Sequence, residues 1–274
     1  MSKLERVNII TPTYNDAHRY LTDTIVSVQR QVLKENNLEL VHTIINDGSS
    51  NKKSIEYLNR IEKIKSVKII NQSNNGLSSA RNAGINYISS DYILPLDSDD
   101  LISPCYLDLL VSKIKTNKNK NSIAYTNWVS FGRYQRFINV KKTTPFNIRF
   151  ANYLPVSLMM HTELVVNNPY DENMLKGCED WDLWIRLICN ECKMSHIRFF
   201  GFFHREHHNN MTGSTLNKYA EIENYIKTKY PKFYSNEYNE KMKKLYPPNL
   251  YDTFRARTNP KFRYFFISKL KNFL

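Results

Sequence analysis

The sequence predicts an α/β fold in which helices flank a mostly parallel central sheet. Short apolar runs typical of strands alternate with segments of helical periodicity through the first hundred residues, and the links between them are short. Polar clusters follow the ends of these strands. Because such sheets bind ligands beyond the carboxyl ends of their strands, the clusters indicate a binding site at that edge.

The first half of the chain contains four predicted strands and three predicted helices in strict alternation. The strands are residues 7–11, 40–46, 67–71 and 92–96, and the helices are residues 21–32, 55–64 and 78–87. This order is that of consecutive strand–helix–strand units, which give parallel strands.

The second half is less regular. Residues 123–131 and 197–203 read as strands, residues 216–229 as a polar helix, and the chain becomes aromatic and basic from Pro247. Residues 181–192 form an apolar helical pattern that buries Trp184 among others, and the pattern contains Cys189 and Cys192. Without a second cysteine pair these two are expected to be buried thiols rather than zinc ligands.

Composition narrows the class of protein. The chain has 274 residues, of which 41% are hydrophobic, and this is enough for one large α/β domain or a domain with an appendage. Its net charge of +13 leaves anionic substrates, an anionic membrane surface and nucleic acid open as partners, but no nucleic-acid-binding signature appears. No apolar run is long enough to span a bilayer, and the polar residues 1–6 followed by a strand predict a cytoplasmic protein without a signal peptide.

An acidic cluster, Asp97-Ser98-Asp99-Asp100, ends the fourth predicted strand. Neighbouring carboxylates repel one another unless a cation or donor groups neutralise them, and magnesium or manganese is often held by one or two carboxylates together with substrate phosphates. The cluster by itself is equally compatible with a metal–phosphate site and with a surface loop that caps the next helix.

Three further polar clusters are expected at the same edge of the sheet. They are Thr11-Pro12-Thr13-Tyr14-Asn15, Asp47-Gly48-Ser49 and Asn74-Asn75-Gly76. The chain has only seven glycines, and two of them, Gly48 and Gly76, lie in these clusters, where positive φ or a close approach to a ligand is needed.

The order and spacing of six motifs resemble family 2 glycosyltransferases of the GT-A fold over roughly residues 7–212. The motifs are Pro12-Thr13-Tyr14-Asn15, Asn46-Asp47-Gly48-Ser49, the stretch from Asn75 to Gly84, Asp97-Ser98-Asp99-Asp100, Glu179-Asp180-Trp181-Asp182-Leu183-Trp184 and His204-Arg205-Glu206-His207. The resemblance implies an inverting enzyme that moves a sugar from a nucleotide sugar to an acceptor hydroxyl in one displacement.

The resemblance implies which residues bind the metal and which residue is the general base. Asp99 is expected to bind Mn²⁺ or Mg²⁺ directly and His207 to complete the site, although the adjacent His208 is an alternative ligand. Asp100 is expected to cap a helix that starts near Leu101. Asp180 takes the position of the general base, and Glu179 that of an orienting or acceptor-binding residue.

Trp181 is a separate candidate, for acceptor binding. Its ring offers a face to an acceptor sugar, while helical periodicity gives core packing as the equal alternative.

The nucleotide pocket is expected to come mainly from the first loops. Tyr14 can stack on the base, and Asp47 can accept the uracil imide N–H, which favours uridine over cytidine but does not exclude thymidine. The further residues expected to bind the nucleotide sugar are Thr11, Pro12, Asn75, Gly76, Arg81, Asp97 at the ribose, Ser98 and Arg205 at the diphosphate.

On this basis residues 1–215 are expected to form the GT-A catalytic domain, with a nucleotide-binding half at 1–100 and an acceptor-binding half at 101–215. Residues 216–274 are expected to form a basic helical extension. In the extension, Phe262, Phe265, Phe266, Leu270 and Phe273 fall on one helical face among basic residues. The pattern fits a peripheral membrane helix at the cytoplasmic face of the inner membrane, and equally a helix docked on the domain.

The expected donor is a UDP-hexose or UDP-N-acetylhexosamine, and the expected acceptor is a glycan or polyprenyl-linked hydroxyl in bacterial surface polysaccharide synthesis. Two other functions remain as alternatives: a sugar nucleotidyltransferase, and a carbohydrate- or lipid-binding relative without activity. The first lacks its glycine-rich phosphate loop after the first strand, and the intact Asp97, Asp99, Asp180 and His207 disfavour the second.

Overall fold

The computed structural model describes residues 4–34, 37–117, 119–207 and 218–257. Within them a curled nine-stranded sheet runs in the order β3-β2-β1-β4-β8-β6-β9-β5, and β7 pairs with β6. The strands are β1 (Glu5–Thr13), β2 (Leu38–Asp47), β3 (Val67–Gln72), β4 (Tyr92–Pro95), β5 (Leu101–Ile102), β6 (Ser122–Gly132), β7 (Arg136–Ile138), β8 (Met159–His161) and β9 (Lys193–Glu206).

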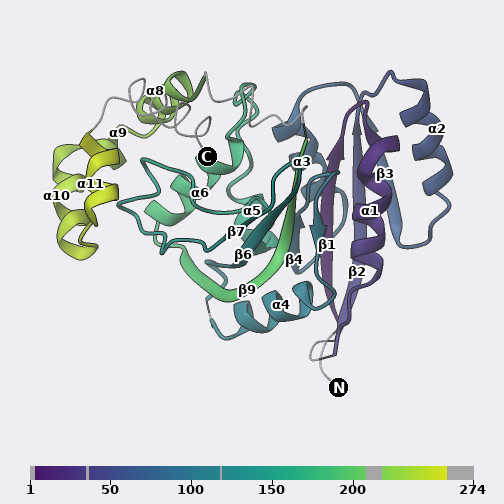
Figure 1. Ribbon diagram of the computed structural model, residues 1–274, viewed down its shortest axis with the longest axis horizontal. Coiled ribbons are helices and arrows are strands. Elements are labelled where there is room, and N and C mark those ends of the chain that lie inside the picture. The colour runs from purple at the N-terminus through teal and green to yellow at the C-terminus, as the bar shows by residue number, and fades with distance from the viewer. Residues whose placement is uncertain (1–3, 35–36, 118, 208–217, 258–274) are drawn as a thin grey trace.

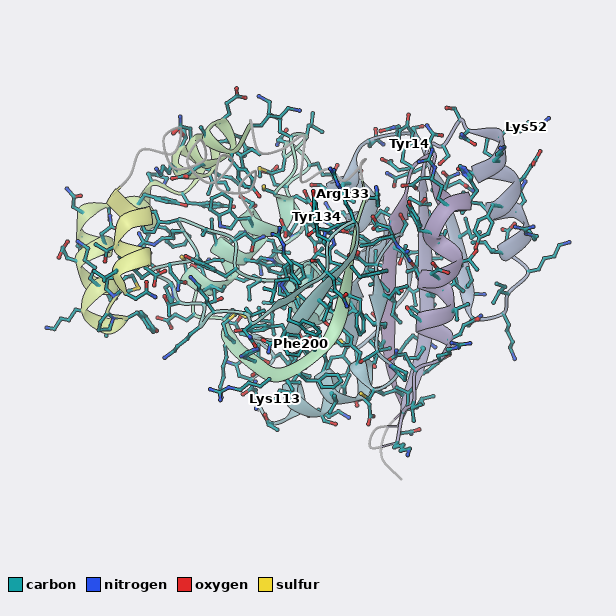
Figure 2. All side chains as sticks on the ribbon, in the orientation of Figure 1. Tyr14, Lys52, Lys113, Arg133, Tyr134 and Phe200 are labelled. Atoms are coloured by element: carbon teal, nitrogen blue, oxygen red, sulfur yellow. The ribbon has the colours of Figure 1, made fainter. Side chains whose placement is uncertain are left out.

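The sheet is mostly parallel, as predicted. Strands β1 to β4 pair in parallel, and so do β6 and β9. Strand β8 joins the two groups by pairing antiparallel with both β4 and β6, so that β6 and β9 point the same way as β1 to β4. The carboxyl ends of six strands therefore lie at one edge. Figure 2 shows Tyr14, which follows β1, at this upper edge, and Lys113 near the opposite edge.

The helices cover both faces of the sheet (Figure 1). They are α1 (Ala17–Gln29), α2 (Lys52–Ile61), α3 (Leu77–Tyr87), α4 (Tyr106–Lys115), α5 (Thr162–Val166), α6 (Glu179–Cys189), α8 (Tyr219–Lys229), α9 (Pro231–Tyr234), α10 (Asn236–Leu245) and α11 (Leu250–Arg257). Each predicted strand and helix of the first half is present, with the helices shifted by a few residues.

Alternation along the strands divides the core into two sides. Ile44 packs with α1 and α2, while its neighbour Ile45 packs with α3 and α6 on the other face. Helix α3 lies very close to the sheet at Gly84, where an added Cβ would stand 2.7 Å from Ile10 and 2.8 Å from Ile45. The helix that leads to the carboxyl-edge loops is thereby fixed tightly on β1 and β2.

The helices after residue 218 pack on the rest of the fold. Ile222, Ile226 and Phe233 are buried in the same cluster as Trp181 and Trp184 of α6. The aromatic face expected between residues 262 and 273 lies outside the described residues. No helix in the described ranges combines the length and apolar character needed to cross a bilayer.

The four cysteines are free thiols, and Cys189 and Cys192 are buried. This is the state that their place in an apolar helical pattern predicted.

Candidate active site

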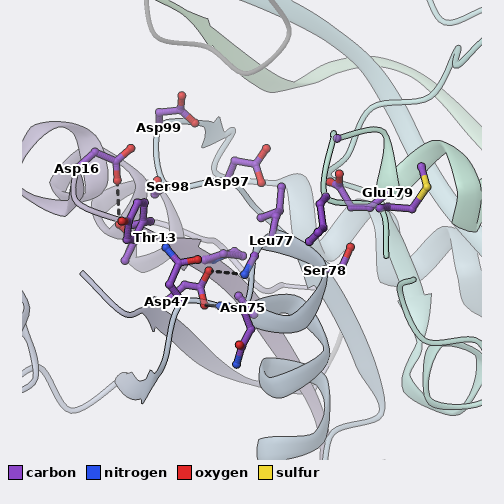
Figure 3. Close-up of a pocket in the computed structure, with 18 of the residues that line it drawn as sticks. Thr13, Asp16, Asp47, Asn75, Leu77, Ser78, Asp97, Ser98, Asp99 and Glu179 are labelled. Atoms are coloured by element: carbon purple, nitrogen blue, oxygen red, sulfur yellow. Dashed lines mark hydrogen bonds between the residues drawn. The ribbon is translucent and has the colours of Figure 1, made fainter. Parts of the chain in front are cut away.

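A cavity of 570 Å³ opens at the carboxyl edge of the sheet (Figure 3). It is bounded by the loops after β1, β2, β3 and β4, by the start of α3, by the end of β9 and by the segment before α6. Its lining includes Pro12, Tyr14, Asp47, Asn75, Gly76, Asp97, Ser98, Asp99, Glu179 and His207, all predicted from the sequence. A volume of this size suits a small organic ligand.

The loops of the cavity are tied to one another. Asn15, with φ 61°, accepts hydrogen bonds on Oδ1 from the backbone N–H groups of Ser50 and Asn51, which joins the loops after β1 and β2. Asp47 accepts from the backbone N–H groups of Asn75 and Gly76 and from Gln72. Asp47 therefore shapes the loop before α3, and both of its oxygens already accept hydrogen bonds from the protein.

Asp99 and His207 meet at the cavity although 108 positions separate them in the chain. His207 Nε2 lies 2.8 Å from Asp99 Oδ2, and its ring stacks on Tyr20 with centroids 5.1 Å apart. Burial, with Asp100 and Asp97 close by, raises the pKa of Asp99 to about 8. Burial also lowers the pKa of His207. The pair thus prefers to be neutral unless a cation joins it.

The expectation that Asp100 caps a helix is wrong. The chain continues from Asp100 into β5, and the next helix, α4, begins only at Tyr106. Asp100 is fully buried, accepts a hydrogen bond from the backbone N–H of Arg205 and lies 3.1 Å from His204 Nδ1. Burial disfavours the charged ring of His204, but Asp100 beside it raises the pKa of this histidine to about 9. Asp100 therefore anchors the end of β9, which carries His207.

Helix α6 presents the two predicted catalytic carboxylates. It begins at Glu179 after Cys178, whose φ of 63° turns the chain sharply into the helix. Asp180 Oδ2 accepts a hydrogen bond of 2.9 Å from Asn152 Nδ2, and Oδ1 accepts one of 2.7 Å from the backbone N–H of Trp181. Burial and the neighbouring Glu179 raise the pKa of Asp180 to about 7. Glu179 lines the cavity, and Asp180 lies next to it, outside the lining.

Arg81 occupies a different place from the one predicted. Its side chain is 1% exposed and lies between Asp97, at 2.7 Å, and Glu179, with the ring of Tyr170 5.3 Å away. Burial opposes its charge, but Asp97 and Glu179 together raise its pKa. Arg81 is thus a buried bridge between two cavity carboxylates, and it is absent from the cavity lining.

Three other predicted residues also lie outside the lining. Thr11 is buried within β1, where its hydroxyl is 2.8 Å from His42. Arg205 donates to the carbonyl of Asp99 and to Asp23 of α1. Trp181 is fully buried and its indole N–H donates to the carbonyl of Ile148. Core packing, the second interpretation of Trp181, is the one that the structure supports.

The cavity is strongly acidic. Six of its lining residues carry carboxylates, namely Asp16, Asp47, Asp97, Asp99, Glu172 and Glu179. No lysine or arginine is among the lining residues that the structure describes. An anionic ligand needs a counter-charge in such a cavity. No group of three or more His, Cys, Asp or Glu side chains suited to a metal occurs in the described ranges.

Sequence patterns missed one wall of the cavity and the partner of Asp180. Glu172, Met174, Leu175 and Gly177 line the cavity from an irregular segment without a motif. Asn152 lies in an equally irregular stretch. Other lining residues to which the sequence assigned no role lie in or next to the recognised motifs, namely Thr13, Asp16, Asn74, Leu77, Ser78, Ala80 and His204.

The chain is similar in sequence and in fold to known proteins. The family model described as "Glycosyl transferase family 2" matches residues 8–163. An uncharacterized glycosyltransferase of Methanocaldococcus jannaschii is 28% identical over 206 residues, which cover 71% of this chain and 68% of the relative. The glycosyltransferase GlyA of Streptococcus pneumoniae is 35% identical over 127 residues, 46% of this chain and 17% of that protein.

A third relative is the minor teichoic acid biosynthesis protein GgaB of Bacillus subtilis, 33% identical over 119 residues that cover 42% of this chain. The chain spans only 13% of GgaB, and so it corresponds to a small part of the longer relatives.

Among solved structures, S. aureus TarS 1–349 in complex with UDP-GlcNAc superposes with a TM-score of 0.64 at 15% identity, over 92% of this chain and 78% of TarS 1–349. The complex of the same TarS fragment with UDP gives a TM-score of 0.61 at 17% identity, over 80% of this chain and 65% of that fragment. At this identity the likeness concerns the fold, and it confirms the predicted α/β architecture.

Proposed function

The chain belongs to glycosyltransferase family 2 and has the GT-A fold, and on this premise we propose that it is an inverting, metal-dependent transferase that uses a UDP-sugar. The donor is a UDP-hexose or UDP-N-acetylhexosamine, and the acceptor is a hydroxyl of a glycan or of a polyprenyl-linked glycan. The observation that carries the proposal is the pairing of Asp99 with His207 inside a cavity whose described lining has six carboxylates and no lysine or arginine.

The ligand set fits a divalent cation. A nucleoside diphosphate carries negative charge into a cavity that repels it, and magnesium or manganese is commonly held by one or two protein ligands together with substrate phosphates. Asp99 and His207 would hold the ion. The bound ion supplies Lewis-acid stabilisation of the diphosphate that leaves.

Asp180 is the proposed general base. In the reaction the acceptor O–H gives its proton to Asp180, and the oxygen forms a bond with the anomeric carbon. On the other side of that carbon the bond to the diphosphate oxygen breaks, and its electron pair leaves with UDP. A pKa near 7 suits this role, because a base is most effective when its pKa lies close to the working pH. Glu179 is paired with Arg81, and it is not the group that takes the proton.

The base of the nucleotide is proposed to lie against Tyr14. This ring is 49% exposed at the cavity and offers a stacking face. Asp47 fixes the loop of Asn75 and Gly76 that forms the floor of the cavity and is proposed to accept the imide N–H of uracil as an additional bond. TarS has been solved in complex with UDP and with UDP-GlcNAc, which supports a uridine donor by analogy.

The acceptor and pathway are proposed from the relatives. GgaB is a minor teichoic acid biosynthesis protein, and we propose that this chain likewise acts in bacterial surface polysaccharide synthesis. A lipid-linked acceptor would be presented at the cytoplasmic face of the membrane, and the basic, aromatic residues 261–273 are proposed to bind that surface.

Vesicle sedimentation tests the membrane component. Chain shortened after residue 257 is expected to lose its binding to vesicles that contain anionic lipid and to keep its binding of UDP with manganese. Unchanged sedimentation of the shortened chain would refute the proposed membrane contact.

The central test is the substitution Asp180→Asn, assayed as UDP release from UDP-GlcNAc and other sugar nucleotides in the presence of Mn²⁺. Loss of a positioned base is expected to lower kcat by about 10²- to 10⁴-fold while binding of the nucleotide is retained. Glu163→Gln is the matched control, because it removes one carboxylate from an exposed pair with Lys120. Full activity of Asp180→Asn would show that Asp180 is not the base.

A further inference from the structure

Asp180 receives its only described side-chain hydrogen bond from Asn152. The backbone N–H of Trp181 occupies Oδ1, so Asn152 Nδ2, at 2.9 Å from Oδ2, is the donor that fixes the plane of the carboxylate. The amide of Asn152 is itself oriented, because its Oδ1 accepts a hydrogen bond from the backbone N–H of Leu154. The N–H₂ group must therefore face Asp180.

Helix α6 holds the segment that contains Asn152 in place through hydrogen bonds. The indole N–H of Trp181, next to Asp180, donates to the carbonyl of Ile148 at 2.6 Å. Asp180 and Trp181 therefore each bond a residue of the stretch 148–152, and the two contacts fix that stretch against the first turn of α6.

The helices after residue 218 also hold this segment in place. Arg149 is fully buried, and its guanidinium donates to the carbonyls of Pro145 and Phe233 and to Asn239 Oδ1 at 2.6 Å. In return Tyr234 donates its hydroxyl to the carbonyl of Arg149. Four aromatic rings surround the guanidinium with centroids 5.0–5.9 Å away, namely Phe146, Phe150, Tyr234 and Tyr238.

We propose that Asn152 is a positioning residue for the base Asp180, and that α9 and α10 hold Asn152 in place through Arg149. This inference rests on the proposed function, in which Asp180 accepts the proton of the acceptor. Asn152 keeps one oxygen of the carboxylate engaged and stabilises its charged form, so that the base is oriented and ionised when the acceptor arrives. The described helices after residue 218 thereby contribute to catalysis without reaching the cavity.

Several charged and titratable groups lie near Asp180 and act on its carboxylate together with Asn152. Glu179 raises the pKa of Asp180, and Arg81 of α3 lowers it. Cys178 and Tyr170 also lie within the influence of its charge. The amide of Asn152 and the backbone N–H of Trp181 are the neutral donors that favour the carboxylate.

The test compares Asn152→Asp with the wild-type full chain. This variant can keep the acceptor for the Leu154 N–H but replaces the donor to Asp180 with a carboxylate. UDP release from UDP-GlcNAc with saturating Mn²⁺ is followed from pH 5 to pH 9. The acidic limb of kcat/KM is expected to move upward by about one to two pH units, because a hydrogen bond to a charged group is removed. The KM for UDP-GlcNAc is expected to stay within about twofold.

Asn121→Asp is the matched control, since it adds the same charge before β6, at the opposite end of that strand from the cavity. It is expected to leave the limb in place. Asn152→Ala provides a second variant, which removes the donor without adding charge and is expected to shift the limb in the same direction by a smaller amount.

The outcomes separate the two proposals. Unshifted limbs in both Asn152 variants, with Asp180→Asn inactive, would overturn the positioning role and leave the proposed function standing. A uniform loss of rate without a shift would also overturn it, because it would show a structural role only. Activity in Asp180→Asn would overturn the base assignment itself.

Discussion

Two adjacent carboxylates at the start of α6 have different environments and hence different chemistry. Glu179 forms an ion pair with the buried Arg81. Asp180 has neutral donors only, and its burial beside Glu179 raises its pKa to about 7. Environments that separate the pKa values of neighbouring acids are how active sites assign distinct roles to chemically similar groups.

The activity is therefore expected to depend on pH through Asp180. Below its pKa the carboxyl is protonated and cannot accept a proton, so kcat/KM should fall about tenfold per pH unit below pH 7 and level off above it. The measurement is the rate of UDP release at saturating Mn²⁺, so that metal occupancy does not change with pH. A limb near pH 4, the value of an ordinary aspartate, would contradict the environment described for Asp180.

At the level of elements, α8 is joined to α6 by one buried ionic cluster. Lys229 at the end of α8 lies 3.0 Å from both oxygens of Asp182, which is fully buried, and 2.5 Å from Asp171. Asp171 begins the segment that supplies Glu172, Met174 and Leu175 to the cavity wall. Lys229 thus holds both α6, which carries the proposed base, and the segment of the cavity wall that the sequence did not predict.

Lys229→Met is expected to lower the free energy of unfolding by about 1–3 kcal/mol, because Asp182 is left buried with the Tyr230 hydroxyl at 3.3 Å and Arg186 at 3.8 Å but without its close ammonium partner. Urea denaturation measures the change. Lys243→Met, which removes an exposed pair with Glu240, is the control and should change stability by less than about 0.5 kcal/mol. Equal effects of the two substitutions would contradict the buried cluster as a stabilising contact.

At the scale of the whole molecule, the net charge and the charge of the cavity lining have opposite signs. The chain carries a net charge of +13, yet the described lining of its main cavity is acidic and lacks lysine and arginine. The positive charge therefore lies elsewhere, where it can favour anionic surfaces. In the proposed function, a divalent cation supplies the counter-charge that a diphosphate needs in this cavity.

Thermal unfolding is expected to show this dependence directly. UDP or Mn²⁺ alone should raise the melting temperature little, while the two together at about 100 times their dissociation constants should raise it by roughly 5–10 °C. Asp99→Asn should abolish the combined effect, since it removes the carboxylate that pairs with His207. The same rise with UDP in the presence of EDTA would argue against a metal bridge.

The sequence predicted those features that depend on local pattern. The order of strands and helices in the first half and the four polar loops at one edge follow from short motifs and parallel topology, while the approach of His207 to Asp99 was implied by the resemblance to family 2 glycosyltransferases. Features that depend on distant pairing were missed. Strand β5 has two residues and exists through its pairing with β9, and this pairing is what converts Asp100 from an expected helix cap to an anchor.

The sequence also could not decide where a residue lies when two environments suit it equally well. Trp181 suits a sugar-binding face and a core position equally, and only the packing of α6 against Ile148 decides between them. Arg81 lies in a motif of the nucleotide half, but its partner Glu179 is 98 positions away. Irregular segments, such as those of Asn152 and Glu172, have no period from which their direction can be inferred.

Arg81 has a consequence for domain exchange between relatives. It is rooted in the half that precedes residue 100, yet one of its two counter-ions, Glu179, comes from the other half. A chimera that grafts a foreign segment onto residues 1–100 must bring a carboxylate to the place of Glu179, or it leaves an arginine that is 1% exposed with a single partner. The two halves are consequently not interchangeable modules, and recombination designed to alter acceptor choice should carry Arg81 and Glu179 over together.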